Sequence, residues 1–93
     1  MRAVLNGVTL AESDETIVVE GNHYFPPESL RSEHFEKTRM KSLCFWKGLA
    51  SYYSVEAAGE SKRNAAWYYP RPYPWIRKIR DHVAFMPGVR VLD

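Results

Sequence analysis

Residues 46–55 read Trp46-Lys47-Gly48-Leu49-Ala50-Ser51-Tyr52-Tyr53-Ser54-Val55. In a β-strand, successive side chains point to opposite faces of the sheet. One face of this segment would carry Trp46, Gly48, Ala50 and Tyr52, and the other Lys47, Leu49, Ser51 and Tyr53. Because both faces include apolar groups, the pattern predicts an interior strand rather than an edge strand, and a β-sheet built around it.

The partner of this strand is predicted at Ala65–Tyr69, after a hairpin loop at Ala57–Asn64. The partner strand ends at Pro70–Pro74, because proline lacks the backbone N–H that a sheet requires. If the two strands pair, four large rings lie on one face as cross-strand neighbours: Trp46, Tyr52, Trp67 and Tyr69. These rings either fill the core or line a ligand-binding cleft.

The first 25 residues read as further antiparallel strands. Asn6-Gly7 separates two short apolar runs and tolerates positive φ at both positions, so it predicts a two-residue hairpin turn. Thr16–Glu20 is rich in β-branched residues and predicts a third strand, which a turn at Gly21-Asn22 closes. His23–Phe25 is a short extended run that precedes Pro26.

Two segments are predicted to lie outside the sheets. Pro27–Arg31 should form about one helical turn, because proline favours the first position of a helix. Ser32–Arg39 is charged and has no clear hydrophobic period, so it is predicted to be a loop.

The C-terminal segment predicts one helix and one hairpin. An apolar stripe at Ile76, Ile79 and Val83 has helical spacing, and basic side chains occupy the other side of this basic helix, residues 75–83. Val83–Phe85 and Val89–Leu92 flank a proline-glycine turn and are predicted to pair as a closing hairpin. Residues 1–93 are therefore expected to form a single domain, mainly antiparallel β, with one short helix.

Composition limits the classes of function. The chain has one cysteine, Cys44, so that it forms no intramolecular disulfide. No N-terminal signal pattern and no run of about 18 apolar residues is present, so we expect a cytoplasmic protein that does not span a membrane and has no membrane partner. A net charge of +2 makes nucleic acid an unlikely partner, since binding by counterion release needs many cations.

Four blocks occur in order along the chain: Tyr24-Phe25-Pro26, Cys44–Tyr53, Ala65–Pro70 and Val83-Ala84-Phe85. Together they resemble a small, mainly bacterial family, domain of unknown function 427, which has a nucleotidyltransferase-like label. The Cys-x-Trp-Lys-Gly and Ala-Trp-Tyr-x-Pro motifs carry the resemblance. It implies a β-tent fold, in which antiparallel sheets meet at an angle as in methionine sulfoxide reductase B.

The resemblance does not imply a metal site or a cofactor in this chain. Some β-tent proteins hold zinc through two Cys-x-x-Cys pairs, whereas Cys44 stands alone here. The three histidines, His23, His34 and His82, have no ligand spacing. Nucleotidyl transfer needs paired carboxylates and a glycine-rich phosphate turn, and the chain has no Asp-x-Asp or Gly-x-Gly. We predict no metal site and no cofactor.

Cys44 and Lys47 are the candidate catalytic residues. A nearby cation can lower the pKa of a thiol and so create a nucleophile. On a regular strand, positions 44 and 47 point to opposite faces, so this pair requires a bend near Phe45. The alternative is that Cys44 is a buried structural thiol.

The preferred hypothesis is that the chain binds a small polar or aromatic molecule in an aromatic-lined cleft. The predicted ligand-binding residues are Glu20, His23, Tyr24, Trp46, Tyr52, Trp67, Tyr69 and Arg71. Two alternatives stay open: an enzyme that uses Cys44 and Lys47, and a protein- or nucleic-acid-interaction module that uses the basic helix 75–83. A homodimer is a further open expectation.

Overall fold

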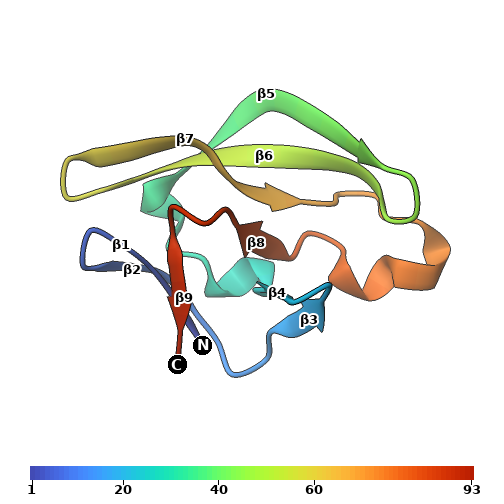
Figure 1. The fold of residues 1–93 in the computed structure, drawn as a ribbon, viewed down its shortest axis with the longest axis horizontal. Coiled ribbons are helices and arrows are strands. Elements are labelled where there is room, and N and C mark those ends of the chain that lie inside the picture. The colour runs from blue at the N-terminus through green and yellow to red at the C-terminus, as the bar shows by residue number, and fades with distance from the viewer.

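A computed structural model describes the whole chain, residues 1–93, as short and long antiparallel strands linked by tight turns (Figure 1). The strands are β1 (Arg2–Leu5), β2 (Val8–Glu12), β3 (Ile17–Val19), β4 (Asn22–Tyr24), β5 (Phe35–Cys44), β6 (Gly48–Ala57), β7 (Glu60–Tyr68), β8 (Val83–Phe85) and β9 (Arg90–Leu92). Three 3-10 helices complete the chain: η1 (Pro27–Ser29), η2 (Ser32–His34) and η3 (Pro74–Ile79). The mainly antiparallel β prediction is confirmed.

The strands form three sheets, with the orders β2-β1-β9, β3-β4 and β5-β6-β7-β8. Phe25, next to β4, exchanges two backbone hydrogen bonds of 2.8 Å with Val83 of β8. The β3–β4 hairpin therefore continues the four-stranded sheet beyond β8. Figure 1 shows β5, β6 and β7 as an upper layer, with β1, β2 and β9 below one end and β3 and β4 below the other.

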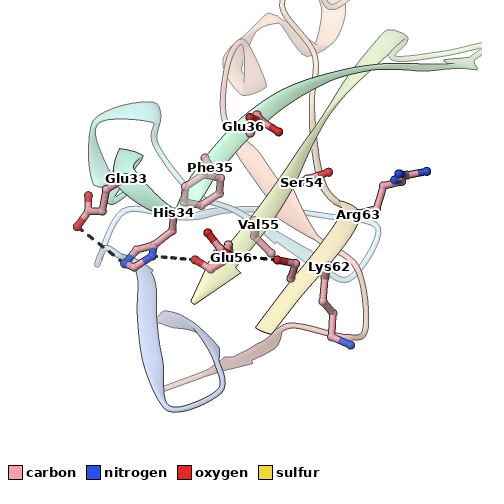
Figure 2. Close-up of a pocket in the computed structure, with 10 residues that line it drawn as sticks. Glu33, His34, Phe35, Glu36, Ser54, Val55, Glu56, Lys62 and Arg63 are labelled. Atoms are coloured by element: carbon pink, nitrogen blue, oxygen red, sulfur yellow. Dashed lines mark hydrogen bonds and ion pairs between the residues drawn. The ribbon is translucent and has the colours of Figure 1, made fainter. Parts of the chain in front are cut away.

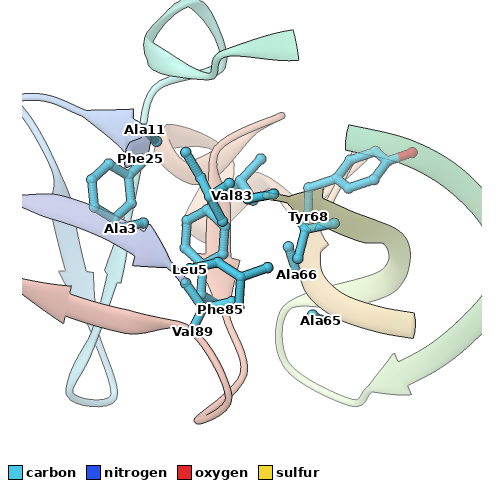
Figure 3. Close-up of a cluster of buried hydrophobic side chains, with 13 residues drawn as sticks. Ala3, Leu5, Ala11, Phe25, Ala65, Ala66, Tyr68, Val83, Phe85 and Val89 are labelled. Atoms are coloured by element: carbon cyan, nitrogen blue, oxygen red, sulfur yellow. The ribbon is translucent and has the colours of Figure 1, made fainter. Parts of the chain in front are cut away.

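Both faces of the four-stranded sheet carry buried side chains, and each face packs against a different part of the chain. One hydrophobic cluster lies against β1 and β2 and includes Leu5, Phe25, Tyr68, Val83 and Phe85 (Figure 3). The neighbours of these residues on β7 and β8 enter a second cluster, whose buried members are Val19, Tyr24, Ala50, Tyr69, Ile76, Ile79 and Ala84. Because successive side chains of β7 and β8 point to opposite faces of the sheet, these strands contribute to two separate cores. Most of the predicted site residues lie in or against the second core.

Pairs of residues with positive φ form the turns of three of the hairpins, β1–β2, β3–β4 and β6–β7. Asn6 and Gly7 have φ values of 51° and 77° and join β1 to β2, which confirms the predicted hairpin. The β3–β4 turn is at Glu20 (55°) and Gly21 (79°), one residue earlier than predicted. This shift places the Glu20 side chain at the tip of a hairpin.

The long central hairpins differ from the prediction in extent. β6 is the interior strand that was predicted, between β5 and β7, but it begins at Gly48 instead of Trp46. The predicted loop at Ala57–Asn64 was wrong, because a tight turn at Ala58 and Gly59 lets β7 begin at Glu60. The side chains at the start of β7 are mostly polar because one face of the strand is exposed to water, so this segment has no apolar pattern from which to predict a strand.

The predicted loop at Ser32–Arg39 was also wrong, because β5 begins at Phe35 and pairs with β6 over most of its length. β5 is an edge strand, mostly exposed, with an irregularity between Lys37 and Lys41. Lysine and arginine on an edge strand hinder pairing with other chains, and they remove the apolar alternation that identifies a strand. Long-range pairing with β6 overrides the weak local signal.

The predicted amphipathic helix at 75–83 was wrong as well. η3 consists of 3-10 turns broken at Ile76, which has φ −129°, and it ends at Ile79. Ile76 and Ile79 are buried as expected, whereas Val83 belongs to β8 and pairs with Tyr68. A six-residue segment gains too few helical hydrogen bonds to keep an α-helix when strand pairing competes for its end.

The predicted closing hairpin does not form. β8 pairs with β7, whereas β9 pairs with β1 in a different sheet. The turn at Met86–Gly88 thus connects two sheets, and it is held by a hydrogen bond of 2.8 Å from the Met86 N–H to the Ala65 carbonyl. None of the short helices is long and apolar enough to cross a lipid bilayer.

Candidate functional site

The turn between β5 and β6 supplies Trp46 and Lys47. Gly48 follows them with φ +122°, and a Cβ atom there would lie 3.3 Å from the Arg71 carbonyl oxygen. The backbone N–H of Tyr73 donates to the Lys47 carbonyl at 2.9 Å. The Trp75 indole N–H donates to the Trp46 carbonyl at 2.7 Å. Glycine at position 48 therefore lets the 71–75 segment clamp this turn.

The Lys47 ammonium is buried in an ion pair with Glu20. Only 7% of the Lys47 side chain is exposed, against 51% of the Glu20 side chain. The other Glu20 oxygen accepts a hydrogen bond of 3.3 Å from the Trp46 indole N–H. The Lys47 Nζ also lies 5.0 Å from the ring centre of Trp46 and 5.7 Å from that of Tyr69, within range of cation–π attraction. Two strand turns far apart in sequence thus enclose one charge.

This environment keeps both partners charged. Burial alone would lower the pKa of Lys47, but its hydrogen bond to Glu20 and the nearby Tyr24 and Cys44 raise that pKa above 10.5. The hydrogen bond from Lys47 holds the pKa of the Glu20 carboxyl below 4.5, against the opposing effect of burial. Lys47 is therefore suited to attracting an anion and is a poor base.

The Lys47–Glu20 pair lies beside a set of rings that we call the aromatic cluster. Its members are the buried Tyr24 and Tyr69 and the half-buried Trp46, Tyr52 and Trp67. The Trp67 indole N–H donates to the Tyr24 hydroxyl at 3.1 Å, and the two rings meet edge to face at 85°. The Tyr52 and Ser42 hydroxyls share a hydrogen bond of 2.9 Å. Burial raises the pKa of Tyr24 and of Tyr69, so both phenols stay protonated.

Cys44 is the last residue of β5 and pairs with Gly48 across the turn. Its side chain is half-buried and packs against the second core beside Trp46 and Tyr52. Residues 45–47 form a turn, and this turn is the bend that a Cys44–Lys47 pair requires. The charge of the thiol is one of the smaller causes that raise the pKa of Lys47.

Two of the predicted ligand-binding residues do not join the cluster. His23 alternates with Tyr24 on β4, so it points away, and its Nδ1 lies 2.9 Å from the Thr16 hydroxyl. The Arg71 side chain is exposed, and only its backbone contacts the turn at Gly48. Ser42 was missed by the sequence analysis. It lies two residues before Cys44 on the same face, a relationship visible only once β5 is known to be a strand.

Open polar cavities lie elsewhere, over the distal parts of β5, β6 and β7. One, of about 450 Å³, includes Glu36, Ser54 and Arg63 in its lining and extends past His34 and Glu56 (Figure 2). A second, of about 630 Å³, shares Glu36, Ser54 and Arg63 with the first and continues along Thr38 and Arg39. We call these cavities the polar groove. None of the predicted ligand-binding residues lines it.

No three histidine, cysteine, aspartate or glutamate side chains are grouped so that they could hold a metal ion. No curated protein matches the chain. A family match, by contrast, covers residues 1–92 and confirms the resemblance to this family. The chain therefore belongs to the family described as Domain of unknown function (DUF427).

Proposed function

We propose that the chain binds a small aromatic molecule with an acidic group, at the exposed edges of the aromatic cluster and next to Lys47. The observation that carries this proposal is the buried Lys47 charge, which lies over the rings of Trp46 and Tyr69 in a cluster that also includes half-buried Tyr52 and Trp67. Burial of an ion pair rarely adds net stability, because desolvation offsets the attraction between the charges. A charge kept in such a place is a candidate for function.

The cluster favours a flat ligand. Trp46, Tyr52 and Trp67 each keep part of their ring exposed, and aromatic rings stack offset or edge to face on such surfaces. The ligand would contact the edges of packed rings, since buried Tyr24 and Tyr69 fill the space behind them. Polar groups for orientation are available from Ser42 and Tyr52.

Lys47 is the reason for proposing that the ligand carries an acidic group. Its ammonium is held protonated, and its present partner, Glu20, is half-exposed at a hairpin tip. A ligand carboxylate can approach the same ammonium and compete with the Glu20 carboxylate. Replacing Glu20 with glutamine removes the competing charge and should strengthen the binding of an acid.

The indole N–H groups provide the test, because the three tryptophans have different partners: Glu20 for Trp46, Tyr24 for Trp67 and the Trp46 carbonyl for Trp75. Nicotinate, anthranilate and indole-3-acetate are titrated into isotope-labelled protein and followed in proton–nitrogen correlation spectra. We expect the signals of Trp46 and Trp67 to shift first. Lys47→Met should bind nicotinate and neutral nicotinamide equally well. Titrations that leave the Trp46 and Trp67 signals unmoved would refute the proposal.

A nucleophilic Cys44 is the second candidate, and the turn at residues 45–47 favours it because Cys44 and Lys47 do not alternate there along one regular strand. A thiolate next to a fixed cation is a nucleophile at neutral pH. The test is alkylation by iodoacetamide, compared with a free thiol and with Lys47→Met. Fast alkylation that slows in Lys47→Met supports the enzyme, and sluggish alkylation of the folded protein excludes Cys44 as the nucleophile.

A further inference from the structure

The end of the molecule at the β5–β6 turn carries exposed apolar side chains, which we call the apolar tip. Phe45 at the turn is 87% exposed, Leu43 is 71%, Trp75 is 69% and Leu49 is 51%. Leu43 and Leu49 are directly paired across β5 and β6. Trp75 is tied to the same turn by its hydrogen bond to the Trp46 carbonyl. Clustered exposed apolar groups of this kind mark an interaction surface.

Apart from Glu20 and Asp81, which are paired with Lys47 and Arg80, the charge around the apolar tip has one sign. The two segments that build it, residues 40–55 and 70–80, contain no aspartate or glutamate. They contain six cations, of which Lys47 is paired with Glu20 and Arg80 with Asp81. The other four, which form no ion pair, are Lys41, Arg71, Arg77 and Lys78. The occupant of this surface must therefore be negatively charged as well as apolar.

The charge and shape of the tip argue against other occupants. A second copy docking through the same tip would bring like cations together, which opposes association. Single-stranded nucleic acid stacks on aromatic rings, whereas half of the tip is the aliphatic pair Leu43 and Leu49. Phe45 stands at the apex, with the leucines behind it on the strands and Trp75 on the adjoining segment. A soft apolar medium can surround such a projection without a preformed pocket.

We propose that the apolar tip docks onto the surface of an anionic lipid bilayer. Phe45, Leu43, Leu49 and Trp75 enter the boundary between headgroups and acyl chains, and the four free cations contact lipid phosphates. The Trp75 indole N–H already has its partner within the chain, so only its hydrocarbon edge faces the lipid. The sequence predicted no membrane partner because it contains no spanning stretch, but a peripheral contact needs only these side chains.

Co-sedimentation of the full chain with vesicles of phosphatidylcholine and phosphatidylglycerol tests the proposal. We expect the chain to pellet with these vesicles and to bind pure phosphatidylcholine at least about five-fold more weakly, since each cation near an anionic surface contributes to binding. Phe45→Ser should weaken binding about ten-fold, because an apolar ring no longer leaves water. Met86→Ser is the matched control, since Met86 is exposed outside the tip at the β8–β9 connection, and it should leave binding unchanged.

The variants replace exposed side chains, so thermal melting should be unchanged and a loss of binding can be assigned to the tip. No pelleting with anionic vesicles at millimolar lipid overturns the proposal, as does equal pelleting of the Phe45→Ser chain. It is also overturned if Phe45→Ser only shifts a dimer to monomers, or only weakens binding to a single-stranded oligonucleotide.

Discussion

Removing either partner of the Lys47–Glu20 ion pair should lower the free energy of unfolding, but by unequal amounts. Glu20→Gln leaves the Lys47 ammonium, whose side chain is 7% exposed, with a neutral acceptor. Breaking a buried pair typically costs 3–5 kcal/mol, but Glu20 is half-exposed, and water can reach its side of the pair. After this discount for solvent screening, we expect Glu20→Gln to cost about 1–2 kcal/mol of unfolding free energy.

Lys47→Met should cost less, within about 1 kcal/mol, although it removes the more buried partner. The methionine can occupy the apolar space between Trp46 and Tyr69, and the Glu20 carboxylate is free to hydrate. In the double variant no charge is left buried, so the double-mutant cycle should give a coupling of about 1–2 kcal/mol.

Urea denaturation at neutral pH measures these costs. A loss of 1–2 kcal/mol lowers the midpoint by about 1 M at the slope typical of small proteins, with the slope unchanged. If Lys47→Met is the more destabilising of the two single variants, or if Glu20→Gln unfolds like the wild type, the account of this pair is wrong.

The same pair gives stability a defined pH dependence. The pKa of Glu20 is lowered by folding, so its contribution is present above pH 4.5 and is lost as the pH falls through the folded value. The pKa of Lys47 is raised, so its contribution is present below pH 10.5 and is lost as the pH rises through the folded value. Glu20→Gln should therefore flatten part of the acid limb of the stability profile, and an acid limb identical to the wild type's would contradict the assignment.

Two further predictions concern the packing around the site. Gly48→Ala should lower the free energy of unfolding by about 2–3 kcal/mol, because the new Cβ meets the Arg71 carbonyl at 3.3 Å in addition to the strain of φ +122°. In the matched Gly59→Ala variant the Cβ meets no atom within 4 Å, and the cost should be about 1 kcal/mol. Equal costs in urea denaturation would show that the Arg71 contact is unimportant. Tyr24→Phe should cost about 1 kcal/mol, because the Trp67 indole N–H loses its acceptor, and an unshifted Trp67 indole signal in that variant would contradict the hydrogen bond.

Local chemistry made some parts of the fold predictable. Asn6-Gly7 predicts its hairpin because the positive φ that both residues adopt is cheap for asparagine and glycine. Alternation along residues 48–53 correctly separates Ala50 and Tyr52 from Leu49 and Tyr53. These signals depend on neighbours in sequence, so one sequence is enough to read them.

Other parts depend on contacts between distant segments, and the sequence alone could not give them. β5 is recognisable only through its pairing with β6, since its own side chains are those of a solvated edge. Glu20 was predicted as a ligand-binding residue, but its placement against Lys47 depends on how the β3–β4 hairpin continues past β8. Ile76 and Ile79 fit both a helix and the 3-10 turns that form, because either buries them.

Soaking crystals with nicotinate and anthranilate would show whether a ligand binds at the aromatic cluster. We expect ligand density against Cys44, Trp46, Tyr52 or Trp67, with the carboxylate within hydrogen-bonding distance of the Lys47 ammonium. Density confined to the polar groove at Glu36, Ser54 and Arg63, with the aromatic cluster unoccupied, would contradict this expectation.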